Sequence, residues 1–251
     1  MNSLATTVIA FVCIFGGALL GFRLRTVLPE DHLSDASRDV VRLGMGTIAT
    51  MTALMLGLLV SSAKASFDSQ SSAVTEMSAK IILLDRALAH YGPEAKDARD
   101  LLRTVVTRLV EETWPAKGRA RSIAVPSASR SEPLYDKIQD LKPETDGQRL
   151  LLTRALNLAT EIGETRWLIV ERGYTPVSRP LVVVVIFSLT ITFMSFALYS
   201  PPNGTLIATF LLAALSVSGV LFLILEMYSP FGGFIEVSSA PLRAALTYLG
   251  Q

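Results

Sequence analysis

Four long apolar runs divide the chain, and none of them contains a charged residue. The runs are residues 4–22, 43–63, 180–200 and 204–225. A helix needs about 20 mainly apolar residues to cross the hydrocarbon core of a bilayer, so each run predicts a transmembrane helix. The runs fall into two pairs, which predicts one transmembrane hairpin over residues 1–63 and a second over residues 180–228.

The second apolar run continues into a polar segment without a break in its helical period. Residues 43–91 contain no proline, and charged residues enter only from Lys64 onward. At about 1.5 Å per residue such a helix would be about 70 Å long, more than twice the hydrocarbon thickness of about 30 Å. The pattern predicts a second span that is continuous with the first helix of a soluble domain.

The residues between the two hairpins, 64–179, predict that soluble helical domain. Gly92 and Pro93 are typical of a helix end and a helix start, and residues 93–113 repeat apolar positions at spacings of three and four. A basic, Ser- and Pro-rich loop is expected at 115–132, and further helices at 134–141 and 144–172. The apolar face of the 93–113 helix needs a partner, for which the first soluble helix offers Phe67, Val74, Ile81, Leu84, Leu88 and Tyr91.

The last residues, 229–251, predict a turn and a short helix. Pro230, Phe231 and Gly232 form the turn, and Ser239 and Pro241 have the types preferred at the cap and first turn of a helix. No strand pattern of any length is found. The predicted fold is an all-α membrane protein in which two transmembrane hairpins flank an antiparallel helical domain.

Composition agrees with a membrane protein and excludes several functions. Half of the residues are hydrophobic, 18% are charged and the mean hydropathy is +0.44. The net charge of +1 gives no field for binding nucleic acid. The single cysteine, Cys13, lies in an apolar run, and the two histidines, His32 and His90, belong to no metal or catalytic motif. We expect no metal, no cofactor and no enzymatic activity, and we expect Asp85 and Arg86 to form a local ion pair.

Small and polar residues form one stripe along the second span. They recur at spacings of three and four, which at about 100° per residue confines them to one narrow face. Either this stripe packs against another helix, as small residues do in lipid, or copies of it surround a pore in which hydroxyls and a lysine favour anions. The stripe consists of Gly46, Thr50, Ala53, Gly57, Ser61 and Lys64. A second small-residue pair, Gly17 and Gly21 in the first span, predicts a helix contact.

Glu226 at the end of the fourth span is the remaining candidate. It is either a residue of the membrane interface or a functional ionisable group that pairs with Lys64 or an arginine of the first connector. An even number of spans places both termini and the soluble domain on one side. Basic residues near the spans do not decide which side: one side has Lys64, Arg166, Arg172 and Arg179, the other Arg23, Arg25, Arg38 and Arg42.

Three blocks resemble a bacterial family called bestrophin-like. They are residues 54–68 (LMLGLLVSSAKASFD), 83–95 (LLDRALAHYGPEA) with Arg99 and Arg103 downstream, and 230–242 (PFGGFIEVSSAPL). The family name reflects a distant similarity to bestrophins, which are pentameric anion channels with a cytoplasmic helical domain between their second and third spans. The resemblance implies a homo-oligomer in the bacterial inner membrane, in contact with lipid, that passes monovalent anions such as chloride.

The resemblance also suggests a second face of the central helix. Bestrophins line their neck with large apolar side chains, and here Met51, Leu54 and Leu58 are the residues of that kind. The resemblance favours the cytoplasm for the soluble domain. The count of basic residues is tied, and because long domains count for less in that rule, charge alone would slightly favour the short connector as cytoplasmic. Two functions remain: an anion channel with residues 43–64 lining or supporting the pore, or a membrane-anchored scaffold or sensor that binds a protein partner.

Overall fold

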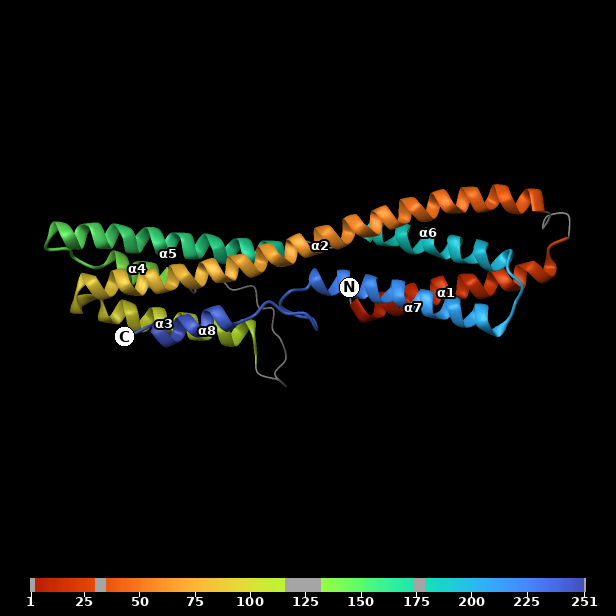
Figure 1. The fold of residues 1–251 in the computed structure, drawn as a ribbon. Coiled ribbons are helices and arrows are strands. Elements are labelled where there is room, and N and C mark those ends of the chain that lie inside the picture. Colours follow the sequence, from red (N-terminus) through yellow and green to blue (C-terminus); the bar gives the residue numbers. More distant parts are fainter. Residues whose placement is uncertain (1–2, 30–34, 116–131, 174–178, 251) are drawn as a thin grey trace. The chain divides into compact units, whose positions relative to one another are not determined.

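The computed structural model of the protein describes residues 3–29, 35–115, 132–173 and 179–250. All of their regular structure is helical, which confirms the predicted class (Figure 1). His32 and most of the basic loop predicted at 115–132 lie outside the described residues. The helices are α1 (Ser3–Val27), α2 (Asp35–Tyr91), the 3₁₀ turn η2 (Pro93–Ala95), α3 (Lys96–Thr113), α4 (Glu132–Gln139), α5 (Asp146–Gly173), α6 (Arg179–Leu198), α7 (Gly204–Met227) and α8 (Ala240–Tyr248).

Four of these helices, α1, α2, α6 and α7, are long and apolar enough to cross a membrane. They contain the four apolar runs of the sequence. Helix α2 continues through 57 residues without interruption, so the predicted continuity of the second span with the first soluble helix is confirmed (Figure 1). Gly92, whose φ of 132° is open to glycine but strained for other residues, ends it.

The chain divides into two compact units that share α2. Unit 1 consists of residues 1–66 and 176–228, and unit 2 consists of residues 67–175 and 229–251. In unit 1, helix α1 packs against both α6 and α7. A core of small and branched side chains joins all four helices: Ala10 and Ile14 from α1, Leu59 and Ala63 from α2, Val185 and Leu189 from α6, and Ala214, Leu221 and Ile224 from α7.

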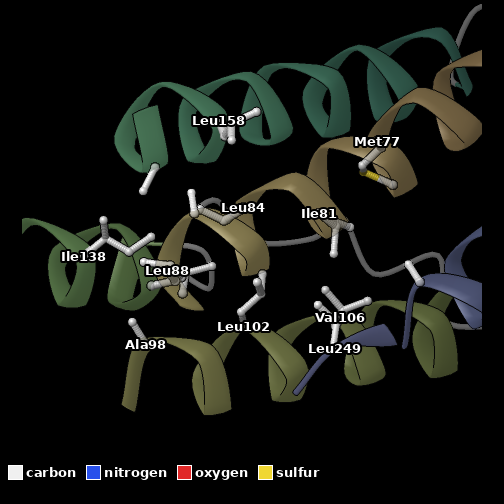
Figure 2. Close-up of a cluster of buried hydrophobic side chains, with 14 of the residues drawn as sticks. Met77, Ile81, Leu84, Leu88, Ala98, Leu102, Val106, Ile138, Leu158 and Leu249 are labelled. Carbon is white, nitrogen blue, oxygen red and sulfur yellow. The ribbon is translucent and has the colours of Figure 1, made fainter. Parts of the chain in front are cut away.

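Unit 2 has a larger apolar core built mainly by α2 and α3. Figure 2 shows Ile81 of α2 pointing toward Val106 of α3, and Leu84, Leu88 and Leu102 belong to the same cluster. This is the packing predicted from the two apolar stripes. Ile138 of α4, Leu158 of α5 and Leu249, just after α8, extend the same core. The apolar periodicity of each helix is therefore satisfied by neighbours within the unit.

The C-terminal segment, residues 229–251, belongs to unit 2 and packs into this core. Its buried residues are Val237, Leu242, Ala245 and Leu249. Side chains of α2 and of the end of α3 also hold its backbone. Ser78 Oγ donates to the carbonyl of Pro241 at 2.6 Å, and Trp114 Nε1 donates to that of Val237 at 2.8 Å. The segment is thus a fixed part of the helical unit.

Candidate functional site: the exposed face of helix α2

Only one side of the membrane part of α2 is buried in unit 1. Thr52, Leu59 and Ala63 are 2%, 6% and 0% exposed and contact the unit's interior. Because α-helical residues follow one another at about 100°, these three positions lie on one face. The rest of the helix circumference is open, so it is the available surface for a partner, for lipid or for a pore.

Every residue of the small and polar stripe lies on the open side. Gly46, Thr50, Ala53, Gly57, Ser61 and Lys64 are all exposed. A Cβ atom built on Gly46 or Gly57 would meet nothing within 4 Å. Among the described residues, no neighbouring helix therefore requires the small size of Gly46 or Gly57.

The glycine pair of α1 behaves in the opposite way. A Cβ on Gly17 would lie 2.8 Å from Thr190 Cγ2 and 2.9 Å from the Thr190 carbonyl oxygen of α6. A Cβ on Gly21 would overlap the backbone of Met194 in α6. The predicted helix contact at Gly17 and Gly21 is confirmed, and it provides an internal reference for small residues that pack within one chain.

The large apolar residues proposed as an alternative constriction are exposed too. Met51, Leu54 and Leu58 are 61%, 66% and 71% exposed. At about 100° per residue their face adjoins the small stripe, and the two faces together cover about half of the helix circumference. If several copies of α2 surround an axis, one face can line the axis while the other packs on the neighbouring copy.

The hydroxyl of Thr50 is already engaged within its helix. Thr50 Oγ1 donates to the carbonyl of Gly46 at 2.9 Å. In this rotamer the side chain presents oxygen lone pairs outward, so an anion at this position would require the hydroxyl to turn. Lys64, at the end of the stripe, is the one residue of the stripe that carries a positive charge.

Glu226, expected at the end of the fourth span, is buried within unit 1. Its side chain is 2% exposed and accepts a hydrogen bond from the hydroxyl of Ser3, in the first turn of α1. The partially positive N-terminus of a helix favours a nearby carboxylate, which offsets part of the cost of burying it. Close by in sequence, Tyr228 Oη donates to Ser62 Oγ of α2 at 3.0 Å. No local sequence pattern marks Ser3, Ser62 or Tyr228, because each contacts a residue far away along the chain.

The C-terminal motif has a structural role in unit 2. Pro230 is buried, and the ring of Phe231 meets that of Trp114 edge to face with centroids 5.7 Å apart. The N–H of Gly232 donates to the carbonyl of Ser229 at 3.1 Å, which closes the predicted turn. The carbonyl of Pro241 accepts from Ser78, as described above.

Asp85 forms a different ion pair from the local one expected. Its carboxylate is bound by Arg99 of α3, with Nε 2.8 Å from Oδ1 and Nη2 3.0 Å from Oδ2. The hydrogen bond to Asp85 raises the pKa of Arg99 above its ordinary value. The pairing partner expected from the sequence was the neighbouring Arg86, whose side chain is exposed. Both Asp85 and Arg99 lie in or just after the second resembling block.

Comparison with known proteins finds similarity over most of the chain. The profile of a family described as "Bestrophin-like domain" matches residues 12–242. The chain is also similar to the crystal structure of a bacterial bestrophin homologue from Klebsiella pneumoniae that carries a point mutation, with a TM-score of 0.65 and 15% identity, covering 96% of this chain and 97% of that chain. No curated protein matches the sequence. The TM-score shows a shared fold, and at 15% identity the likeness shows the fold alone.

Proposed function

The chain belongs to the bestrophin-like family, and on that premise we propose that it is an oligomeric anion channel whose pore is lined or supported by the exposed face of α2. The observation that carries the proposal is the open stripe from Gly46 to Lys64. It lies in an apolar helix long enough to span a membrane, its residues are exposed, and a Cβ atom on Gly46 or Gly57 would meet none of the described residues within 4 Å. A surface of small and polar side chains gains little from lipid and is suited to a second copy or to water.

The two α2 faces support an assembly about an axis. A pore needs one face toward the axis and another toward the neighbouring subunit, and α2 offers two adjoining open faces of different character. Small side chains let helix backbones approach closely, whereas large apolar side chains narrow a pore by excluding water. Bestrophins have five subunits, and we propose the same number for this protein by analogy alone.

The scaffold alternative draws less support from the geometry. A membrane anchor with no transport activity would use small residues to pack its own spans together. The chain does so at Gly17 and Gly21, whereas the α2 stripe is left open. We therefore place the channel first, with the soluble unit on the cytoplasmic side of a bacterial inner membrane.

Anion flux from liposomes that contain the purified protein tests the proposal. Gly57→Leu should strongly reduce flux, because it adds a large side chain to the open stripe. Lys64→Glu should lower the preference for anions over cations, because it reverses the charge at the end of the stripe. The matched control is Gly219→Leu, since Gly219 is also exposed in a membrane-spanning helix and a Cβ there meets nothing within 4 Å.

The outcomes separate the two functions. Flux that is lost in Gly57→Leu and kept in Gly219→Leu supports a pore at α2. Absence of flux from folded, oligomeric wild-type protein would favour the scaffold, and capture of a protein partner by the soluble unit would become the next experiment. Flux that is equal in all variants would mean that the pore is not lined by the exposed stripe of α2.

A further inference from the structure

The open face of α2 carries a basic residue at each end. Arg42 precedes Gly46 by the same four-residue step that separates Gly46 from Thr50, so it continues the stripe toward the start of the helix. Arg42 is exposed, as the residues of the stripe are. From Arg42 to Lys64 the helix rises by about 33 Å at about 1.5 Å per residue, which is close to the hydrocarbon thickness of about 30 Å. The two cations therefore bracket the apolar part of the face.

The charge of this face is set at its two ends. Residues 43–63 contain no charged side chain. An anion that approaches the membrane part of the face therefore meets Lys64 at one end or Arg42 at the other. Lys64 belongs to the proposed pore, whereas the function proposed for α2 leaves Arg42, beside the connector of the first two spans, without a role.

A second guanidinium lies one turn before Arg42. Arg38 precedes it by four residues, which places the two about 40° apart around the helix. The Nε atom of Arg38 is buried and has no hydrogen-bond acceptor among the described residues. Arginine keeps its charge and has only donors, so leaving a buried donor unpaired costs free energy that an anionic acceptor would recover. This donor points to a ligand that accepts hydrogen bonds.

Helix stability does not account for basic residues at this end of α2. The N-terminus of a helix carries a partial positive charge, which favours acidic side chains in the first turns and disfavours basic ones. Asp35 and Asp39 follow that preference, whereas Arg38 and Arg42 oppose it. Asp39 lies about 60° from Arg42 on the side away from Arg38, and Asp35 lies about 10 Å farther along the helix axis than Arg42. The positive helix end and the two guanidinium groups together favour an anion.

We propose that Arg38 and Arg42 form a binding position for a small anion at the start of α2. The ligand chemistry is that of a negatively charged acceptor, which a dissolved anion and the phosphate of a lipid headgroup both offer. As the entrance of a pore, the position rests on the proposed function, and it would then collect anions at the mouth opposite Lys64. As a binding position it needs only the two arginines and the open face.

Charge-selective thiol modification measures the potential at this position. Gly46→Cys, one turn from Arg42 on the same face, and Gly44→Cys, about 200° from Arg42 around the helix, are made in a Cys13→Ser background. A Cβ atom at either glycine meets nothing within 4 Å, so the two positions are matched. Rates are measured with an anionic and with a cationic methanethiosulfonate on oligomeric protein in maltoside micelles, which contain no phosphate. Arg42→Gln tests the site, and Arg23→Gln, at an exposed arginine of α1 beside the same connector, is the control.

The ratio of anionic to cationic rates should be several-fold higher at position 46 than at position 44, and Arg42→Gln but not Arg23→Gln should lower it several-fold. Replacing gluconate by thiocyanate at equal ionic strength should lower the ratio as well if a dissolved anion binds. A fall only in phosphatidylglycerol nanodiscs would assign the position to a lipid headgroup. Equal ratios at the two positions, no reaction at position 46, or a ratio that neither anion changes would overturn the proposal.

Anion flux from liposomes, recorded separately with wild type and Arg42→Gln, distinguishes this proposal from the channel itself. A rate ratio that depends on Arg42 in protein without flux contradicts the proposed channel and leaves the binding position intact. Flux that continues in protein whose rate ratio is independent of Arg42 overturns the binding position alone.

Discussion

Asp85 and Arg99 are joined by two parallel hydrogen bonds that link α2 to α3 inside unit 2. The carboxylate is almost fully buried, with a side chain only 4% exposed, while that of Arg99 is 22% exposed. A buried carboxylate is tolerated because the guanidinium binds both of its oxygens. Removing the arginine would leave the charge uncompensated, whereas removing a surface arginine would not.

We therefore expect Arg99→Met to destabilise the protein by about 3 kcal/mol or more. Arg103→Met, on the exposed side of the same helix, should change stability by less than about 0.5 kcal/mol. Thermal and denaturant unfolding of the purified protein measure both. Because the pKa of Arg99 is raised in the folded state, its contribution is present below its ordinary pKa and is lost only above it. The difference in stability between the two variants should thus be constant across neutral pH. A difference that shrinks or disappears near neutral pH would contradict this assignment.

Lys80 forms a contrasting ion pair at the surface. Its ammonium lies 2.9 Å from Glu76 and 3.1 Å from Glu161. The side chain of Glu76 is 64% exposed and that of Glu161 is 50% exposed. The hydrogen bonds to Glu76 and then to Glu161 raise the pKa of Lys80, so this contribution too is complete below its ordinary pKa of 10.5 and fades only above it. We expect Lys80→Met to cost less than about 1 kcal/mol and the cost to shrink in high salt. A larger, salt-independent loss in denaturant unfolding would disprove this.

The glycine pair of α1 should be intolerant of larger side chains. Gly21→Leu would force α1 away from the backbone of α6, and overpacking of this kind typically costs about 1–3 kcal/mol. Gly219→Leu should leave the stability of the isolated subunit unchanged. Melting temperature in detergent measures both variants, and equal melting of Gly21→Leu and wild type would show that the α1–α6 contact is not as close as described.

The Ser3–Glu226 hydrogen bond should stabilise the packing of α1 on α7. Ser3→Ala leaves the buried carboxylate without this donor, and the loss of a hydrogen bond to a charged group is worth about 1.5–3 kcal/mol. Glu226→Gln keeps an acceptor but removes the charge, so it should weaken the bond and, through α1, the oligomer in detergent. A double-mutant cycle with unfolding and size-exclusion readouts tests the coupling. Additive effects would mean that the two residues act independently.

Trp114 should fix the C-terminal segment through its indole N–H. Trp114→Phe keeps the aromatic contact with Phe231 but leaves the buried carbonyl of Val237 without its donor, at a cost of about 1–2 kcal/mol. Hydrogen exchange of the amides in residues 237–249 should become faster. Trp167→Phe, at a tryptophan that is 52% exposed, is the control. The same exchange in both variants would remove the hydrogen bond from the account.

The helices follow from sequence because their signals are local. The uncharged runs, the uninterrupted period of α2 and the Gly92–Pro93 break depend on residues a few positions apart, and the structure has helices at those places. The apolar stripes of α2 and α3 likewise indicate their mutual packing, since each needs a partner and each is nearest to the other along the chain.

The candidate site is less accessible to sequence reasoning. Gly17 with Gly21, and Gly46 with Gly57, are small residues in apolar helices, yet the first pair is in tight contact and the second is open. The difference depends on which face of each helix meets its neighbours, and that is set by packing of the whole unit. The pairs Asp85–Arg99 and Ser3–Glu226 join separate helices, so no local spacing reveals them.

Thiol modification during flux tests the pore at α2 most directly. Gly57→Cys and Leu58→Cys, one on each open face, and Gly219→Cys as control, are made in the Cys13→Ser background and reconstituted in liposomes. A negatively charged methanethiosulfonate is added while anion flux is recorded, and mass spectrometry reports the extent of modification. We predict that modification abolishes flux at whichever of positions 57 and 58 faces the axis and leaves it unchanged at position 219. Complete modification at both 57 and 58 with undiminished flux would contradict it.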